Sequence, residues 1–497
     1  MPGPYDVVVV GAGNAALCAA LAAREQGAKV AVLEKAGFDE RGGNSYYTAG
    51  GFRFPYRGIE DIRGVIPDLS DAEVEGIEVG SYDRNAMYDD VMRVTESQAD
   101  SELLEHLLTN AYPTVQWLKD YAGLHWVLMY GRQAYKVDGK LRFWGGMITE
   151  AVGGGAGLVD QEFTACERLG VDVLYGTKGV SLVTDPKSGA VTGLRIKDEN
   201  GFSEIETKTV VIAAGGFEAN MEMRTRYLGA GWEFVKVRGT RHNTGDGIKM
   251  ALDIGAQSYG HWSGAHAVAW DYNAPPTGNR RIGDLYQKHS YPLGLIFNMK
   301  GERFVDEGAD LRNYTYAKYG REILKQPLGI AFQVFDQQTI GMLRDEYRIK
   351  EITKAESDTI PGLAADLGID VGEFVRQVEA YNAACKGGDY DPSRLDGVGT
   401  EGIDPPKSNW ALPLSKPPYV GFAVTCGITF TFGGLRIKAN TAQVLDTEDV
   451  PMPGLYAAGE LVGGLFWHNY PGGTGLMAGS VFGRTAGAAA AKAALGK

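Results

Sequence analysis

Several features that would identify common classes of protein are absent from this sequence of 497 residues. Its four cysteines, Cys18, Cys166, Cys385 and Cys426, lie far apart, and no CxxC, zinc-type or haem-attachment spacing occurs. We therefore expect no metal site and interpret the cysteines as buried or incidental thiols. An excess of basic residues is also missing, because the formal net charge is −13. Nucleic acid is not an expected partner, since phosphate binding requires a basic surface.

Segments that would export the chain or anchor it in a membrane are lacking as well. The sequence begins MPGPYDVVVVGAG, which has no basic region followed by a cleavable apolar stretch. The apolar run VVVV is far too short to span a bilayer. We expect a protein of the reducing cytoplasm that is not a transmembrane protein.

Glycine, in contrast, is abundant, with 69 residues. This number indicates many tight turns and places where the backbone approaches a ligand closely. The length predicts two or three domains.

The strongest signal is the stretch YDVVVVGAGNAALCAALAAREQGAKVAVLEK at residues 5–35. Residues 7–10 are β-branched, as in a buried parallel strand, and an alanine-rich helix is expected to follow up to about Gln26. Gly27 would end the helix, and a second strand would close at Glu34. The pattern predicts a complete βαβ unit that binds a dinucleotide.

Each position of the GxGxxA motif has a physical role in this unit. Gly11 allows the tight turn, Gly13 lets the backbone meet a pyrophosphate, and Ala16 lets helix and strand pack closely. The helix begins at Asn14 and Ala15, where free amides stabilise phosphate charge. Glu34, followed by Lys35, stands where a carboxylate would bind the ribose hydroxyls.

The next segment, KAGFDERGGNSYYTAGGF, favours FAD over NAD. It is a long loop of small residues, along which a flavin must pass, and it contains Gly43, Asn44, Ser45, Gly50 and Gly51. Here the sequence resembles the flavoprotein family of fumarate reductase and succinate dehydrogenase. Some members of that family attach FAD through a histidine in this loop. Residues 44–51 contain no histidine, so the resemblance implies noncovalent FAD.

The resemblance extends to the end of the chain and implies further contacts with FAD. A hairpin with a turn at Asn200-Gly201 is expected to lead into a buried strand that ends in AAGG. A closing loop, GGLFWHNYPGGTGL, leads into a final alanine-rich helix whose N-terminal amides would stabilise the reduced flavin. The additional FAD-binding residues that the resemblance implies are Val180, Ala214, Gly215, Gly459, Glu460, Thr474, Gly475 and Leu476.

Between these segments the character of the sequence changes. From about residue 261 aromatic, proline and histidine residues become frequent and strand periodicity weakens. We therefore expect an α/β fold in which a Rossmann-like FAD-binding domain of the glutathione-reductase type, residues 1–260 and 430–497, is interrupted by an α+β capping domain, residues 261–429. No second GxGxxG follows a strand. A separate electron acceptor, soluble or membrane-associated, is therefore implied.

The segment GERFVDEGADLR, residues 301–312, resembles a fumarate reductase segment, GERFVNE…TRD. The family arginine transfers a proton to the substrate carbon, so the resemblance implies that role for Arg312. Arginine stays protonated in water, so it needs a closed, dry site with acids behind it. Glu307 and Asp310 are the expected acids. His266, in SGAHAV, resembles the histidine that binds a substrate carboxylate in these enzymes.

Two departures from the fumarate reductase pattern concern the substrate. Tyr470 stands where the family has a second carboxylate-binding arginine, with His468 two residues earlier, and an HTMGG segment becomes ITFTFGG. A tyrosine followed by glycines also resembles the Δ1-ketosteroid dehydrogenases, in which tyrosines act on a ketone. Tyr470 is therefore a second catalytic candidate. A ketosteroid-like 1,2-dehydrogenase and a fumarate-reductase-type enoate reductase remain alternatives.

An anionic substrate is favoured by two observations. Basic residues and histidines gather in the expected cap, namely Arg241, His242, Arg280, Arg281, Lys288, His289 and Arg303. Of these we expect Arg241 and His289, with His266 and His468, to bind a small carboxylate. The segments RFVDEGADLRNYTYAKYGR and GGLFWHNYPGGTGLMAG also resemble the tricarballylate dehydrogenases, which oxidise propane-1,2,3-tricarboxylate to cis-aconitate. The expected activity is thus an FAD-dependent oxidoreductase acting on CH–CH groups.

Overall fold

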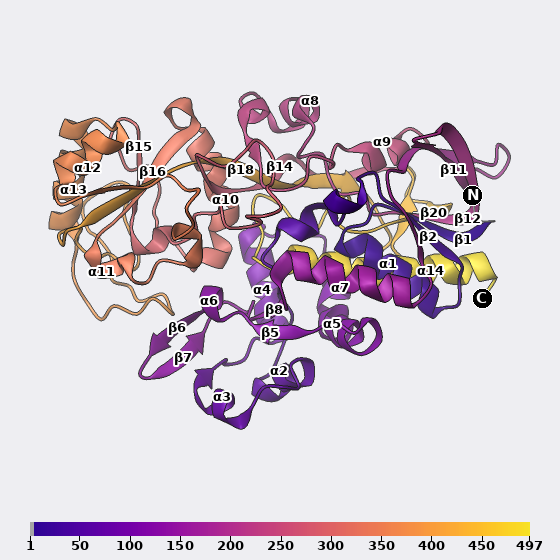
Figure 1. Cartoon of the computed structure of the whole chain (residues 1–497), viewed down its shortest axis with the longest axis horizontal. Helices are drawn as coiled ribbons and strands as arrows, with labels where there is room; N and C mark the ends of the chain where they lie inside the picture. Colours follow the sequence, from indigo (N-terminus) through magenta and orange to yellow (C-terminus); the bar gives the residue numbers. More distant parts are fainter. Residues whose placement is uncertain (1–3) are drawn as a thin grey trace.

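A computed structural model describes residues 4–497. The molecule is elongated, and both termini lie at one end, next to the largest sheet (Figure 1). This eight-stranded sheet has the order β10-β11-β12-β1-β2-β9, with β20 beside β12 and β19 beside β20. Its strands are β1 (Tyr5–Val10), β2 (Val30–Leu33), β9 (Asp172–Leu174), β10 (Lys178–Thr184), β11 (Val191–Asp198), β12 (Gly201–Ile212), β19 (Gln443–Leu445) and β20 (Pro451–Ala457).

The expected βαβ unit is confirmed. Strand β1 pairs in parallel with β2 and with β12, and α1 (Asn14–Glu25) connects β1 to β2. The expected hairpin is β11 and β12, whose turn residues lie between the paired residues Asp198 and Gly201. The expected final helix is α14 (Thr474–Leu495), which packs on α1. This packing is close because a Cβ atom added at Gly487 would lie 1.9 Å from the carbonyl oxygen of Ala19.

A second, six-stranded sheet occupies the opposite end of the molecule (Figure 1). Its order is β13-β18-β16-β15, and β14 and β17 also pair with the long β18. The strands are β13 (Lys236–Val237), β14 (Ser258–Asp271), β15 (Leu295–Asn298), β16 (Ile330–Phe335), β17 (Ala355–Ser357) and β18 (Tyr419–Leu435). The boundaries expected at residues 261 and 429 fall within β14 and β18, and β13 joins this sheet from an earlier part of the chain.

The helices near this second sheet are α8 (Met221–Met223), α10 (Tyr316–Leu324), α11 (Gln337–Ile340), α12 (Ile360–Leu367) and α13 (Val371–Ala384). Helix α10 packs against β14 and β18, so the segment that follows Arg312 is fixed to the sheet. Helix α9 (Asp246–Leu252) follows Gly245 and packs near β10 of the first sheet.

A third part, residues 51–168, contains helices together with two small three-stranded sheets. The helices are α2 (Ile59–Val65), α3 (Asp71–Glu75), α4 (Arg84–Val94), α5 (Ser101–Trp117), α6 (Tyr130–Gln133) and α7 (Gly154–Arg168). The strands are β3 (Gly51–Phe52), β4 (Ile77–Glu78), β5 (Trp126–Leu128), β6 (Ala134–Val137), β7 (Lys140–Phe143) and β8 (Thr149–Ala151). Within residues 4–497 no helix combines the length and apolarity needed to traverse a bilayer.

Candidate active site

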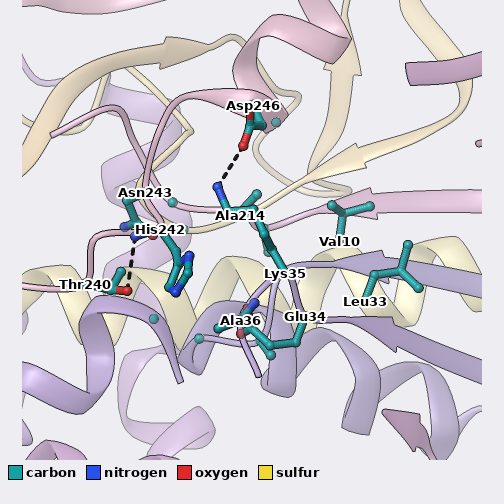
Figure 2. Close-up of a pocket in the computed structure, with 18 of the residues that line it drawn as sticks. Val10, Leu33, Glu34, Lys35, Ala36, Ala214, Thr240, His242, Asn243 and Asp246 are labelled. Carbon is teal, nitrogen blue, oxygen red and sulfur yellow. Dashed lines mark hydrogen bonds and ion pairs between the residues drawn. The ribbon is translucent and has the colours of Figure 1, made fainter. Parts of the chain in front are cut away.

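A cavity of about 870 Å³ lies where β1, α1 and β2 meet, and we call it the nucleotide cavity. In Figure 2, Val10 and Leu33 lie on one side of the view, and Asn243 and Asp246 lie across from Glu34 and Ala36. Gly11 has φ +107°, and an added Cβ atom would lie 2.3 Å from the carbonyl oxygen of Ala213. Only glycine fits this turn. The turn directs the N-terminus of α1 toward the cavity.

The charged groups of the nucleotide cavity are already paired within the protein. One oxygen of Glu34 accepts a hydrogen bond of 2.8 Å from the N–H of Ala36, and burial raises the pKa of Glu34. Lys35 donates to Asp246 at 2.8 Å (Figure 2), and Lys178 donates to the other oxygen of Asp246 at 2.8 Å. These two lysines hold the pKa of Asp246 at about 2, against the effect of burial. Lys35 therefore lines the cavity with its charge neutralised.

A second cavity of about 1280 Å³ continues from the first. The two cavities share the lining residues Asn14, Ala15, Asn44, Ser45, Gly459 and Glu460, so a ligand as long as FAD can lie across both. Of the expected FAD-binding residues, Ala16, Gly50, Val180 and Thr474 line neither cavity, and all the others line one or both. Gly179 takes the expected place of Val180. At the start of α14 the hydroxyl of Thr474 is buried and has no partner within residues 4–497, although Thr474 lines neither cavity. The residues present fit FAD, because one continuous channel runs through both cavities and meets the glycine turn and the N-terminus of α1.

Two carboxyl groups meet where the cavities join. Glu460 accepts a hydrogen bond of 2.9 Å from the N–H of Thr431, and Glu218 lies directly behind it, held by Asn44 and by Asn243. Burial and the charge of Glu460 raise the pKa of Glu218 well above its ordinary value.

The far end of the second cavity is lined by three arginines, and we call this end the arginine cavity. Arg132 comes from α6, Arg238 follows β13, and Arg312 precedes α10. Asp284 lies between two of them. Its carboxylate accepts three hydrogen bonds, from Arg132 at 2.6 Å, from Nε of Arg238 at 2.9 Å and from Gln287 at 2.7 Å.

Arg312 is the arginine that no acid neutralises. Within residues 4–497 it forms no ion pair; its Nη2 donates weakly to the carbonyl oxygen of Arg132 at 3.5 Å, and its Nε has no partner. Its guanidinium lies over the rings of Trp144, at 5.7 Å, and Tyr316, at 5.3 Å. Burial and the positive charge of Arg344 lower the pKa of Arg312 to about 9.

The acids expected behind Arg312 do not support it. Glu307 is buried in an ion pair with Arg303, and Asp310 pairs with Arg93. The reason lies in the chain path: Arg312 turns toward the cavity, whereas both acids face other cations. Arg312 instead experiences the positive charge of Arg344, which the buried Glu346 only partly offsets.

Two buried histidines accompany Arg312. His266 lines the arginine cavity and is 1% exposed, and neither of its ring nitrogens has a partner. His289 is buried next to Tyr316, does not line the cavity, and likewise lacks partners for its ring nitrogens. Burial, with Arg238 near His266 and Arg312 near His289, lowers the pKa of both rings well below the ordinary value. Both histidines are therefore neutral at physiological pH.

A pair of tyrosines faces His266. The Tyr316 hydroxyl donates to the Tyr470 hydroxyl at 2.8 Å, and the N–H of Gly473 donates to the same oxygen at 3.3 Å. Burial and Tyr470 raise the pKa of Tyr316 well above its ordinary value. Tyr470 thus lines the cavity beside His266, as part of a hydrogen-bonded relay.

The structure does not bring the other expected residues into this cavity. Arg241 is exposed and pairs with Glu40 near the mouth of the nucleotide cavity, and the N–H of His468 donates to His261 outside the cavity lining. The remaining members of the expected basic cluster have partners elsewhere: Arg280 donates to the carbonyl of Arg41, Arg281 pairs with Glu351, Lys288 with Asp271 and Arg303 with Glu307.

Four residues that line the arginine cavity were not expected from the sequence, namely Arg132, Arg238, Asp284 and Tyr316. The first three come from separate segments that carry no motif, and they meet only because the second sheet folds over the third part of the chain. Tyr316 lies four residues after Arg312, at the start of α10. A helical spacing from Arg312 was the one signal that could have identified it.

Comparison with known proteins places this geometry in a family. Residues 6–476 match the FAD binding domain family. The chain is 31% identical over 502 residues to the protein named "Probable fumarate reductase Ifc3" of Shewanella frigidimarina, which covers 99% of this chain and 76% of that protein. It is 28% identical to the vinyl phenol reductase of Lactiplantibacillus plantarum, over 94% of this chain and 92% of that protein.

Solved structures agree with this assignment. The open conformation of a flavocytochrome c3 fumarate reductase superimposes with a TM-score of 0.73 at 28% identity, over 99% of this chain and 79% of that one. The chain therefore belongs to the FAD binding domain family of fumarate-reductase-like flavoproteins, and it is an FAD-dependent oxidoreductase that acts on carbon–carbon bonds.

Proposed function

We propose that the chain transfers hydrogen at the carbon–carbon bond next to a carboxylate of a small acid, with the oxidation of tricarballylate to cis-aconitate as the specific reaction. One observation carries the proposal: Arg312 lies buried in the arginine cavity, and no acid within residues 4–497 forms an ion pair with it. Burying an unpaired cation is costly, and a bound anion removes that cost. A substrate carboxylate is the anion that a guanidinium binds with two parallel hydrogen bonds.

The residues of the cavity suit the removal of hydrogen from adjacent carbons. Bound FAD supplies the hydride chemistry, and the saturated acid loses one hydride and one proton to become the unsaturated acid. Arg312, whose lowered pKa makes its neutral form accessible, would accept the proton from the carbon next to the carboxylate, and the guanidinium so formed would pair with that carboxylate. Neutral His266 offers a hydrogen bond to the carboxylate or to the charge that develops on it. Phe430 and Tyr470 close the space around these groups and exclude water.

The names of the relatives leave the substrate open. One is a fumarate reductase and another a vinyl phenol reductase, and they differ in whether their substrates carry a carboxylate. The arginines of this chain support the acid, and the local resemblance of the segments around Arg312 and Tyr470 supports a tricarboxylate. We further propose a separate electron acceptor, either soluble or membrane-associated, that reoxidises the flavin.

An anaerobic screen tests the proposal. The FAD-loaded protein is mixed with tricarballylate, succinate or a 3-ketosteroid, and the loss of flavin absorbance is followed. The dithionite-reduced protein is mixed with cis-aconitate, fumarate or a dienone steroid, and the return of absorbance is followed. We expect tricarballylate to bleach the flavin fastest. A flavin that responds to the steroids and to none of the acids would refute the proposal.

A ketosteroid-like 1,2-dehydrogenase is the second candidate function. One specific arrangement, the hydrogen-bonded pair of Tyr316 and Tyr470, favours it. The Tyr470 oxygen receives hydrogen bonds from both Tyr316 and the N–H of Gly473, an arrangement that would polarise a substrate ketone. Tyr470→Phe separates the candidates. Reduction by the acid should fall by less than about tenfold, whereas loss of a ketone's main donor would cost about 100-fold or more.

A further inference from the structure

We propose that Asp284 is a specificity-determining residue that limits how many substrate carboxylates the arginine cavity binds tightly. The proposal rests on the carboxylate chemistry proposed above. It concerns a different group from Arg312, since Asp284 itself is not expected to exchange protons with the substrate.

Asp284 already occupies the position between two arginines that a substrate carboxylate would otherwise take. Both of its oxygens are engaged: Oδ1 accepts from Arg238, and Oδ2 accepts from Arg132 at 2.6 Å and from Gln287 at 2.7 Å. The side chain is 5% exposed, and all of these partners line the same cavity. The protein thus supplies one carboxylate of its own to the site.

The charges of the cavity differ from one arginine to the next as a result. Arg132 and Arg238 both form ion pairs with Asp284, while Arg312 forms no ion pair within residues 4–497, and the buried Glu346 acts on Arg132 and Arg312 without direct contact. The other acid of the lining, Glu460, lies at the junction with the nucleotide cavity, where it meets Glu218. The first carboxylate of a substrate therefore binds Arg312 without competition. Each further carboxylate has to share a guanidinium with Asp284 and is repelled by it.

This arrangement has a consequence for a reaction whose substrate and product are both polyanions. Three fully available arginines would hold a trianion by several bidentate pairs and would release it slowly. With Asp284 in place, one carboxylate anchors the molecule and the others bind weakly. The residue therefore lowers the selectivity for polycarboxylates relative to monocarboxylates of similar size.

A purely structural role for Asp284 predicts something different. If Asp284 only orients Arg132 and Arg238, its replacement should weaken the binding of every acid by a similar factor. The two accounts therefore differ in the ratio of affinities, which general loosening of the site does not change.

The test compares three acids of different charge, butyrate, glutarate and tricarballylate, by calorimetric titration of the protein whose FAD has been reduced with dithionite, so that none of the acids is oxidised during the measurement. In Asp284→Asn the dissociation constant of tricarballylate should fall by about tenfold or more, that of glutarate less, and that of butyrate by no more than about twofold. Equal changes for all three acids would overturn the proposal. Asp271→Asn is the matched control, because Asp271 is a buried acid that pairs with Lys288 outside the cavity lining, and it should leave the ratios unchanged.

A second variant keeps the proposal testable if Asp284→Asn folds poorly. Arg132→Gln leaves Asp284 paired with Arg238, so Asp284 keeps one of its cations. It should shift the ratio of the affinities for tricarballylate and butyrate in the opposite direction. The binding of tricarballylate should weaken by about tenfold and that of butyrate by less than about threefold. An unchanged ratio in this variant would overturn the proposal. If the wild-type protein binds none of the acids, the proposed function fails; if it binds them and neither variant shifts the ratio, only the role of Asp284 fails.

Discussion

The nucleotide cavity and the arginine cavity differ in where their polar atoms find partners. Among the residues lining the nucleotide cavity, none of those within 4–497 carries a buried side-chain nitrogen or oxygen without a hydrogen bond. In and around the arginine cavity such atoms are frequent: Nε of Arg312, both ring nitrogens of His266 and His289, and Nη1 of Arg344. The buried polar atoms of the nucleotide cavity therefore have hydrogen-bond partners within the protein, whereas several of those in and around the arginine cavity lack one and are available to a ligand.

The difference follows from what each end recognises. A dinucleotide is bound largely by backbone N–H groups at a glycine turn and a helix start, which need no side-chain partners. A small acid is recognised through side chains whose charge the protein itself must not cancel. Unsatisfied buried groups cost stability, so they are retained where they serve binding. The contrast between the cavities is therefore informative about function.

The largest expected effect comes from disturbing the end that is built on backbone. In Gly11→Ala the new Cβ atom would lie 2.3 Å from the carbonyl oxygen of Ala213, and φ is +107°. We expect nearly complete loss of bound FAD and a decrease of several kcal/mol in the free energy of unfolding, since neither collision nor strain can relax cheaply. Flavin content after purification and thermal unfolding measure both.

Gly27→Ala is the matched control. Gly27 also has a positive φ, of +90°, but an added Cβ atom would meet nothing within 4 Å. This variant should lose some stability and keep its full complement of FAD. A Gly11→Ala protein that is as yellow as the control would show that the turn does not shape the cofactor site.

Removing the charge that has no partner should have the next largest effect. Arg312→Ala should bind FAD normally, because Arg312 lies at the far end of the second cavity, away from the lining that it shares with the nucleotide cavity. Its flavin should be reduced by the substrate acid at least about 100-fold more slowly. Arg281→Ala removes an exposed arginine that pairs with Glu351 and should react at the wild-type rate. Stopped-flow reduction under anaerobic conditions separates the two. A rate within threefold of wild type in Arg312→Ala would break the proposed contrast between the cavities.

The sequence was sufficient to predict most of the lining of the nucleotide cavity, but it was not sufficient to predict the lining of the arginine cavity. Gly11, Gly13 and Glu34 lie within one βαβ unit, so local spacing fixes their positions in space. Arg312 was identified through a motif, but Arg132, Arg238 and Asp284 belong to distant segments. Their meeting is a property of the packed sheet and of the helices around it.

Charge alone was a poor guide to the second cavity. Arg241, Arg281 and Arg303 lie in the basic region of the sequence, yet each pairs with an acid. Glu307 and Asp310, near Arg312 in the sequence, form ion pairs with Arg303 and Arg93. Which cation remains unpaired depends on side-chain directions, which a sequence pattern does not specify.

A third variant, at Glu150, tests whether a charged group near the arginine cavity lowers the free energy of unfolding. Glu150, on β8, is largely buried, and burial raises its pKa to about 7, partly offset by Arg132. A carboxyl whose pKa is raised on folding stabilises the fold at low pH, and that contribution disappears as the pH rises from the unfolded value to 7. Glu150→Gln should therefore increase the free energy of unfolding by roughly 1–3 kcal/mol at pH 8.

Denaturant unfolding at two pH values checks this expectation. At pH 5 the gain should be less than half of that at pH 8, because the wild-type carboxyl is then protonated in the folded state. Glu204→Gln, which changes an exposed residue of β12, should show no such dependence on pH. A Glu150→Gln variant that is equally destabilised at both pH values would indicate that Glu150 forms a favourable ion pair instead.

The smallest effect expected concerns a single hydroxyl, and it tests whether an atom without a protein partner marks a ligand. Thr474 Oγ1 is buried at the start of α14 and has no partner within residues 4–497. Valine has the same shape, so Thr474→Val should leave the unfolding of the FAD-free protein unchanged or make it slightly harder. If the hydroxyl binds FAD, the dissociation constant of FAD should rise by about five- to tenfold, the cost of one hydrogen bond.

Thr485→Val is the matched control on the same helix: Thr485 Oγ1 lies 2.9 Å from Nε2 of His106, so this variant should lose stability and keep its affinity for FAD. Titration of the FAD-free proteins with FAD measures both constants. Equal affinity for FAD in Thr474→Val and wild type would mean that a buried group just outside the cavity lining can stay unsatisfied without serving the cofactor.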